Sequence, residues 1–593
     1  MPLSSRNEEI RILFIEPGKR SDPLFCELKV VLLSQDPKYT ALSYVWGDGH
    51  VTVPILVNDE DMRINQSLAV ALLYLRHPND RVVLWVDRLC INQGNAEEKE
   101  QQVQLMTKIY RNAVRTVIWL GESADNSELA MDFISNVETV VSQDWNDETF
   151  LKNIAPWKAL KALMERPWWS RTWTIQEAYL SRLPIIKCGE KETHLENLVR
   201  LNEEYSEHFW TDLDRFNFGR PFDNVPFSTH LSVWHDTREM IQTEGGHILI
   251  SWLGCSSRAQ ATLTRDKVFA LFGLLRPKEQ QSLIQEGIKP SYKTNADGTF
   301  QVPDRDIFKA VTAHNLKTST SLYHLQSGRN PKTLDLPSWV VHYSTSTVDI
   351  SDPLTSYTAD GGSGGNDRWT ELGCPQWQPN GARFVRLSAD LEILTLVGVH
   401  FDKVEFVGQG AYVEIPRHYD DEQKQPIFVK RNHQLRGCMK DWQSQAFAWS
   451  ANPYNTVSGA RYEAFWRTLI CDRLSDYTSL PPSSLGAGFE AWMEKPTVSS
   501  VASPEARTFG YAAIPRCHSR AFIITEKGYF GLAPRAAAVG DIVTVLRGGE
   551  TPFVLRERGD IFQLVGAAYV HGITNGEVTK TMEACDIREF ELR

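Results

Sequence analysis

The pattern of apolar and polar positions changes along the 593-residue chain. From Tyr39 to about Gly189, apolar runs of strand length alternate with longer stretches of helical periodicity. This alternation is typical of a parallel β-sheet flanked by helices. Longer, mainly helical stretches continue from Glu190 to about Arg276, and the C-terminal end carries short strand-like runs broken by turn residues. The sequence therefore predicts an α/β domain, a mainly helical region and a small β-rich C-terminal module.

Within the α/β domain the apolar runs define individual elements. The predicted strands are Thr40–Val45, Val82–Val86, Thr116–Leu120 and Pro184–Cys188. The predicted helices are Ser67–Arg76, a helix from Asn95 to about Asn112, and Trp168–Leu180. Asn65 or Ser67 is expected to cap the first helix, and Asn95 with Glu98 three residues later is a typical helix start. Farther along, Arg265–Leu275 is the clearest helical pattern.

We divide the chain into four regions at changes of pattern and at two flexible segments. The regions are 38–200 (α/β), 201–359 (helical), 360–505 (mixed, with loops) and 506–593 (β-rich). The segments DGGSGGND, from Asp360 to Asp367, and EKPTVSSVASPE, from Glu494 to Glu505, have loop composition. The first satisfies G-x-S-x-G at Ser363, but a nucleophile elbow needs a strand before it and a helix after it, which are not expected here.

Composition excludes several classes of function. Hydrophobic residues make up 42% and charged residues 23%, an ordinary globular balance. The formal charge of -11, without a basic block, argues against nucleic acid as a partner. We expect a cytoplasmic protein, because no apolar run approaches the roughly 18 residues of a membrane span and the N-terminus lacks the pattern of a signal peptide.

The nine cysteines are spread singly along the chain, without a C-x-x-C pair. This spacing favours reduced, buried thiols and predicts neither a structural metal nor a bound cofactor. The chain also has no G-x-x-x-x-G-K-[ST] segment, so we expect no P-loop nucleotide switch.

Four segments carry a family resemblance. They are LSYVWGD from Leu42, LWVDRLCINQ from Leu84, QVQLMTKIYRNAVRTVIWLG from Gln102 and RPWWSRTWTIQEAYL from Arg166. In this order and spacing they resemble the fungal heterokaryon-incompatibility (HET) domain. Later segments, such as RDKVFALFGLL, LPSWVVHY and the stretch from Arg520 to Glu577, are similar to those that follow this domain in large fungal proteins. The resemblance implies a role in incompatibility, programmed cell death or fungal innate immunity.

HET domains are also similar to TIR domains, and three features of this sequence fit. ALSYVWGD resembles the first TIR box, LWVDRLCIN resembles the second TIR strand with its aspartate at Asp87, and Trp173 to Glu177 repeats the W-x-x-x-E arrangement. The resemblance implies a flavodoxin-like sheet, whose ligands bind outside the carboxyl ends of the strands. The segments from Ser43 to Asp48 and from Asp87 to Gln93 are expected at those ends.

Some TIR domains cleave the nicotinamide-ribose bond of NAD with the glutamate of W-x-x-x-E. The resemblance therefore implies Glu177 as a catalytic carboxylate, with NAD or a related nucleotide as substrate, since a fixed negative charge stabilises an oxocarbenium-like ribose. The residues expected to contact this substrate lie in the same motifs: Ser43, Tyr44, Trp46, Gly47, Asp87, Asn92 and Trp173.

A structural interpretation stays open for most of these residues, and Tyr44 and Trp46 can simply pack the loop. Glu177 can pair with Arg171, Arg182 or a loop amide, Asp87 can cap the loop that follows it, and the Ser43 hydroxyl can bond to backbone. Asn92 with Gln93 can shape a turn. Tryptophans 168, 169 and 173 are common core residues, and Cys90 fits a small buried hydrophobe.

Two functions therefore stay open. One is a death effector that hydrolyses NAD, and the other is an adaptor that assembles through its HET domain without chemistry. A metabolic role is a weaker third. The expected partners are a nucleotide, a triggering incompatibility or NLR-type protein, and a second copy of the chain.

Overall fold

The chain folds into two units in a computed structural model that describes residues 3–4, 8–47, 50–143, 153–209, 227–319, 321–326, 335–343, 385–410, 421–454, 459–475, 479–494, 503–518 and 520–593. The first unit consists of Met1–Ile307 with Tyr343–Ser346, and the second of Phe308–His342 and Thr347–Arg593. The predicted loop of Asp360 to Asp367, including Ser363, lies outside the described residues. The division into four regions stays a prediction.

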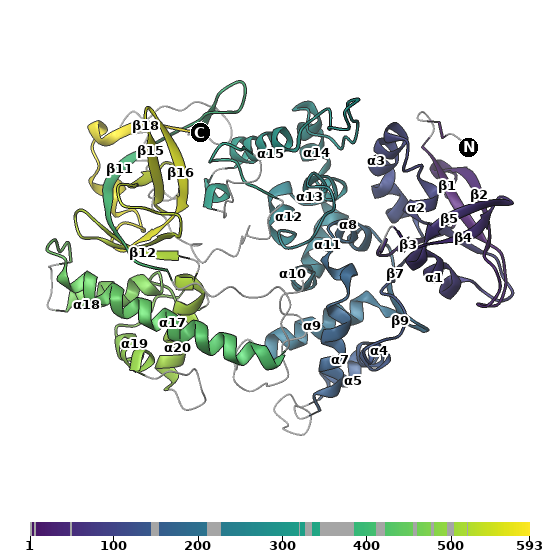
Figure 1. Cartoon of the computed structure of the whole chain (residues 1–593), viewed down its shortest axis with the longest axis horizontal. Coiled ribbons are helices and arrows are strands. Elements are labelled where there is room, and N and C mark those ends of the chain that lie inside the picture. The colour runs from purple at the N-terminus through teal and green to yellow at the C-terminus, as the bar shows by residue number, and fades with distance from the viewer. Residues whose placement is uncertain are drawn as a thin grey trace. The chain divides into compact units, whose positions relative to one another are not determined.

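A nine-stranded sheet organises the first unit (Figure 1). Its order is β5-β4-β2-β1-β6-β3-β7-β8-β9. In chain order the strands are β1 (Glu9–Ile15), β2 (Phe25–Leu32), β3 (Thr40–Ser43), β4 (Thr52–Val57), β5 (Glu60–Asn65), β6 (Val82–Trp85), β7 (Arg115–Trp119), β8 (Pro184–Cys188) and β9 (Lys191–His194). The four predicted strands are confirmed as β3, β6, β7 and β8.

This sheet is mixed: its central strands are parallel, and β2 and β4 also pair in parallel nearer one edge. Strands β6, β3, β7 and β8 run parallel, with Ala41 paired to Trp85 and Ser43 paired to Ile118. Strand β1 is antiparallel to both β6 and β2, while β4 with β5 and β8 with β9 form antiparallel pairs. The expectation of a parallel sheet is therefore correct for the strands of the motifs and wrong for β1 and for the two edge strands, β5 and β9. Short antiparallel edge strands such as β5, whose first four residues are exposed, lack a long apolar run that would reveal them.

Helices flank the sheet as the sequence predicts. Helix α1 (Gln66–Leu75) packs on β4 and β5, α2 (Asp87–Cys90) packs on β1, and α3 (Ala96–Asn112) follows in the chain. The Asn95 side chain accepts hydrogen bonds from the backbone of Glu97 and Glu98, which confirms it as the cap of α3. Asn65 occupies the N-cap position of α1, as predicted, but its side chain makes no capping hydrogen bond.

The predicted helix from Trp168 to Leu180 is interrupted. Residues Pro167–Ser170 form a 3-10 turn, and α8 begins only at Trp173 and ends at Tyr179. Between them Arg171 is extended, and the Thr172 amide donates to the Gln260 carbonyl over 2.9 Å. A tertiary backbone bond thus competes with the helical pattern and breaks the helix.

The rest of the first unit is mainly helical. It contains α4 (Ser127–Ser135), α5 (Val137–Val141), α7 (Ala155–Met164), α9 (Leu195–Phe209), α10 (Ser228–Ser232), α11 (Trp234–Thr243), α12 (Leu249–Cys255), α13 (Asp266–Phe269) and α14 (Pro277–Gln285). The predicted helix of Arg265–Leu275 is wrong as a single element: α13 is followed by a 3-10 turn at Phe272–Leu274. Arg265 is fully buried and donates to the carbonyls of Ser291 and Val302 and to the Asp304 carboxylate, so its place is set by tertiary bonds.

The second unit confirms the predicted β-rich module. Its strands are β10 (Val385–Leu387), β11 (Leu394–Val407), β12 (Arg520–Thr525), β13 (Phe530–Pro534), β14 (Ile542–Leu546), β15 (Phe553–Arg558), β16 (Ile561–Ala567), β17 (Tyr569–Val570) and β18 (Ile587–Leu592). The path β14-β15-β16-β18-β11 closes on itself, because β11 also pairs with β14. Each strand of this ring is paired on both sides, and β11, which precedes residue 506, completes it.

Helices accompany this barrel in the second unit. They are most of α15 (Asp304–Thr318), α17 (Asp421–Ala448), α18 (Ala460–Leu469), α19 (Leu485–Glu494), α20 (Pro504–His518) and α21 (Glu577–Thr581). In the described part of the chain, no helix is both long and apolar enough to cross a membrane.

Candidate functional site

Ser43 and Glu177 meet at the carboxyl end of the central strand β3. Ser43 is the last residue of β3, and its hydroxyl donates a hydrogen bond to Glu177 Oε2 on α8. The same hydroxyl accepts a hydrogen bond from Trp168 Nε1 over 2.8 Å. Ser43, Glu177 and Trp168 are exposed by only 1%, 5% and 0%. The structure thus brings two predicted site residues into contact, inside the protein.

The surroundings of Glu177 favour its neutral form. Burial raises the pKa of the Glu177 carboxyl to about 7 and outweighs the Arg171 charge, which lowers it. Hydrogen bonds from Ser43 and Tyr110 also stabilise the carboxylate, whereas the negative charge of Asp87 opposes it. A carboxyl group with a pKa near 7 can exchange a proton at physiological pH, which is the property that general acids and bases need.

Trp46 and Asp87 form a second pair beside the ends of β3 and β6. Trp46 Nε1 donates to Asp87 Oδ2 over 2.9 Å, and the Arg88 amide donates to Asp87 Oδ1 over 2.7 Å. Asp87 is the first residue of α2, which agrees with the interpretation that its side chain caps the following segment. Contact of Asp87 with a ligand stays a prediction. Burial raises the pKa of Asp87, and the Arg171 charge lowers it. Arg171 therefore acts electrostatically on both carboxylates of the site.

The side chains of Asn65 and Ser67 fix the loop that follows β3. The Trp46 carbonyl accepts hydrogen bonds from Asn65 Nδ2 over 2.9 Å and from Ser67 Oγ over 2.7 Å. The two residues expected to cap α1 thus fix this loop instead. Gly47 has a φ of +69°, and a Cβ there would lie 3.1 Å from Ser67 Oγ, so the turn requires glycine. Asp48 lies outside the described residues.

Tyr44 is close enough to both carboxylates for them to act on its hydroxyl. Asp87, Arg171, Arg88 and Glu177 all act on its hydroxyl, although burial is the main cause that raises its pKa. The ring is only 3% exposed, and the hydroxyl has no hydrogen-bond partner within the described residues. The Tyr44 carbonyl accepts a hydrogen bond from Arg171. Buried hydroxyls without a hydrogen-bond partner are uncommon in folded proteins. The Tyr44 hydroxyl therefore adds an unsatisfied polar group to the site.

Trp173, Asn92 and Cys90 have other surroundings. Trp173 is half-buried and hydrogen-bonded to the Asp266 carboxylate, which also accepts from the Tyr292 hydroxyl over 2.7 Å. Asn92 is exposed, and its Oδ1 accepts from the Gly94 amide over 3.2 Å, as expected of a turn residue. Cys90 is fully buried, and burial raises the pKa of its thiol to about 12, which suits a structural residue.

Sequence reasoning did not assign Tyr110 or Trp168 to the site, and it named Arg171 only as a possible structural partner of Glu177. Tyr110 lies on α3 and reads as one of its regularly spaced core residues, and Trp168 is one of several neighbouring tryptophans. Their polar atoms come close to Ser43, Tyr44 or Glu177 only when the chain folds, because the contacts depend on tertiary packing. As for metals, no group of three or more His, Cys, Asp or Glu side chains in the described part of the chain is arranged to hold an ion.

Two family descriptions match regions of this chain. Residues 39–177 match "Heterokaryon incompatibility protein (HET)", and residues 499–590 match "Het-6 beta-barrel domain". The chain thus contains one region similar to the HET domain and a separate region similar to the Het-6 barrel domain. It is similar to Heterokaryon incompatibility protein 6, OR allele, of Neurospora crassa, with 26% identity over 688 residues that cover 98% of this chain and 96% of that protein. No solved structure matches.

Proposed function

We propose that this protein acts in heterokaryon incompatibility as a cell-death effector and that its HET region is the acting part. The main support is that the similarity to the Neurospora crassa incompatibility protein extends over nearly the whole of both chains. The HET match also contains every predicted site residue, from Ser43 to Glu177. A protein partner of the incompatibility or NLR type would trigger it in the cytoplasm.

Within this role, the candidate chemistry is cleavage of the nicotinamide-ribose bond of NAD or a related nucleotide by Glu177. Two features support it. The parallel strands β6, β3, β7 and β8 have the order 2-1-3-4, which is the beginning of the flavodoxin-like and TIR-like arrangement. Ser43 and Glu177 meet at the carboxyl end of β3, where such sheets bind ligands.

Burial sets a condition on this chemistry. Glu177 and the side chains that surround it are almost fully enclosed, so a nucleotide reaches the carboxylate only after the site opens. Arg171 and Arg88 then offer positive charge beside the loop of Trp46, suited to the phosphates of a dinucleotide. If the site never opens, the same contacts serve the alternative function, an adaptor that assembles through its HET region.

The test combines a cellular and a chemical measurement on the full chain. The wild type, Glu177→Gln and the control Glu165→Gln, which alters an exposed glutamate of the HET region, are expressed in one of two fungal strains to be fused. Viability of the heterokaryon and nicotinamide release by the purified proteins are then compared. We expect Glu177→Gln alone to lose both activities.

Other results reject parts of the proposal. Heterokaryons that stay viable with the wild-type chain reject the incompatibility role. Death that persists with Glu177→Gln, without nicotinamide release by any variant, rejects the hydrolase and supports the adaptor. Self-association measured by light scattering then shows whether assembly accompanies death.

A further inference from the structure

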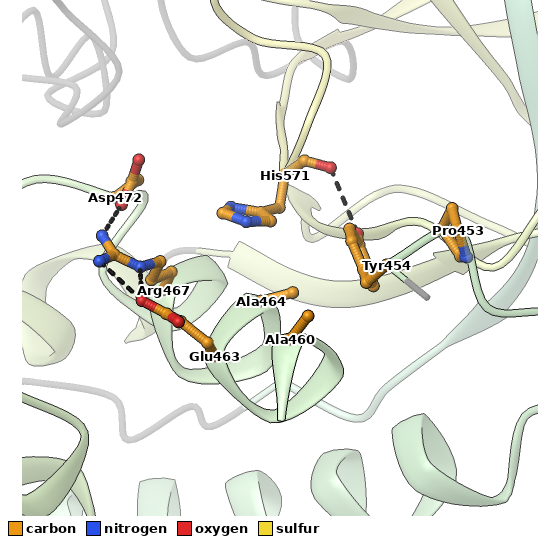
Figure 2. A pocket seen from close by; sticks show the side chains of 8 residues that line it. All are labelled: Pro453, Tyr454, Ala460, Glu463, Ala464, Arg467, Asp472 and His571. Atoms are coloured by element: carbon orange, nitrogen blue, oxygen red, sulfur yellow. Dashed lines mark hydrogen bonds and ion pairs between the residues drawn. The ribbon is translucent and has the colours of Figure 1, made fainter. Parts of the chain in front are cut away.

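A polar pocket of about 360 Å³ lies in the second unit, far along the chain from the HET region (Figure 2). One wall is α18, and another is the turn that follows β17. The residues that line it are Pro453, Tyr454, Ala460, Glu463, Ala464, Arg467, Asp472 and His571. Charged groups therefore gather on one side of the pocket, and small or apolar side chains on the other.

Arg467 is shared by two carboxylates of this pocket. Its Nε donates to Glu463 Oε1 over 2.9 Å, and its Nη1 donates to Asp472 Oδ1 over 2.6 Å. Arg467 and Asp472 are each exposed by 16%, whereas Glu463 is exposed by 40%. Because the guanidinium is already bound by two carboxylates, an anionic ligand would have to displace one of them.

Acceptor atoms, by contrast, are available. Glu463 Oε1 accepts from Arg467 and from Ser483 Oγ, but Glu463 Oε2 and Asp472 Oδ2 have no donor within the described residues. The His571 ring is directed into the pocket toward Arg467, as Figure 2 shows. Its Nδ1 bonds to the Tyr569 hydroxyl over 2.8 Å, and its Nε2 has no partner in the described part of the chain.

The charge of the pocket is negative. Two carboxylates, of Glu463 and Asp472, and one guanidinium, of Arg467, line the pocket, and Glu577 adds a third carboxylate that acts on His571. Burial nevertheless lowers the pKa of His571, so its ring is neutral at pH 7. The pocket therefore holds a surplus of negative charge that a bound cation would neutralise.

The backbone holds Asp472 in place over Arg467. Cys471 and Asp472 both have left-handed φ angles, of 52° and 53°, although neither is glycine. The Asp472 amide donates to the Arg467 carbonyl over 2.8 Å, which turns the chain back after α18. Such conformations cost energy and persist where the surrounding structure enforces them. The carboxylate is thus preorganised at the side of the pocket.

From these contacts we propose that the pocket binds an organic cation, a guanidinium or primary ammonium group on a short aliphatic chain. The cation bonds to Glu463 Oε2 and Asp472 Oδ2, and the aliphatic chain packs against Pro453, Tyr454 and Ala460. Charge-assisted bonds to two carboxylates give specificity for the cation. The same chemistry occurs in a free amine and in a basic side chain of a partner protein.

Calorimetric titration of the full chain tests this binding. The probes are agmatine, arginine amide, a short peptide with one central arginine, and citrulline amide, which replaces the guanidinium by a neutral group of similar shape. We expect citrulline amide to bind at least tenfold more weakly than arginine amide. Tighter binding of the peptide identifies a partner protein as the source of the cation, and tighter binding of agmatine identifies a free amine.

Three variants complete the test. Asp472→Asn keeps a side chain that tolerates the left-handed backbone but removes the charge, and we expect about tenfold weaker binding. Ala460→Leu narrows the half-buried rim without altering any charge and should abolish binding even if Asp472→Asn fails to fold. Glu490→Gln, on α19, is the control, since its exposed carboxylate accepts from Tyr462 outside the pocket. Equal binding of citrulline amide and arginine amide, or unchanged binding by Ala460→Leu, overturns the proposal.

Discussion

The hydroxyl of Ser43, at the end of β3, donates to the carboxylate of Glu177, which lies 134 positions later in the chain. This bond joins the first and last of the HET-like motifs at the centre of the sheet. The same hydroxyl accepts from Trp168 Nε1, so one small side chain links a carboxylate and a fully buried indole. Ser43 is therefore a structural as well as a candidate functional residue.

Ser43→Ala should destabilise the protein and raise the pKa of Glu177 further. The substitution leaves Trp168 Nε1 buried without its acceptor, which costs about 1–3 kcal/mol, and it removes a bond that lowers the Glu177 pKa. Denaturant unfolding measures the stability. Ser170→Ala is the control, since the Ser170 hydroxyl donates only to the Pro167 carbonyl at the surface. Equal midpoints for the two variants would contradict the role assigned to Ser43.

Glu177→Gln should stabilise the protein at high pH while abolishing any activity of the site. The folded pKa of about 7 lies above the usual value of 4.5, so the folded state retains a proton that the unfolded state loses. Stability contributed by this group therefore falls as the pH rises from about 4.5 to 7. At about 1.4 kcal/mol per pKa unit, the stability of the variant relative to the wild type should be roughly 3 kcal/mol greater at pH 8 than at pH 4.5. Unfolding measured at both pH values checks this, and a variant that loses stability at pH 8 contradicts it.

Arg11→Met should be strongly destabilising. Arg11 donates to both oxygens of Glu98, over 2.6 and 3.0 Å, and both side chains are less than 10% exposed. Removing the cation leaves a buried carboxylate without its partner, which costs about 3–5 kcal/mol. Lys108→Met breaks the exposed pair with Glu8 and should change stability by about 0.5 kcal/mol or less. Similar losses for the two variants in chemical denaturation would reject this ranking.

His230→Leu should reduce the loss of stability in acid. His230 is completely buried, and burial lowers its pKa to about 3. Below pH 6.5 the unfolded state binds a proton at this histidine, whereas the folded state binds it only below about pH 3. The stability of the protein therefore falls as the pH is lowered from about 6.5 to about 3. Between pH 7 and pH 5 the contribution is about 2 kcal/mol. Unfolding at the two pH values should show a smaller difference for His230→Leu, but an unchanged one for the exposed control His77→Leu.

The elements that local patterns specify were predictable. The strands near Thr40, Val82, Thr116 and Pro184 are short apolar runs bounded by polar residues, and the cap at Asn95 uses a bond between neighbours in sequence. The breaks at Arg171 and within Arg265–Leu275 were not predictable. In both, hydrogen bonds to distant backbone groups override a local helical pattern.

The sequence by itself determined the α/β alternation of the first unit, the β-rich C-terminal end and the motifs that hold Ser43, Asp87 and Glu177. These follow from periodicity and residue type, which act over a few neighbouring positions. Only the tertiary structure decided that Ser43 meets Glu177, that Trp173 turns to Asp266, and that β11 closes the barrel. Such contacts join residues far apart in the chain, and their geometry and burial arise only when the strands and helices pack together.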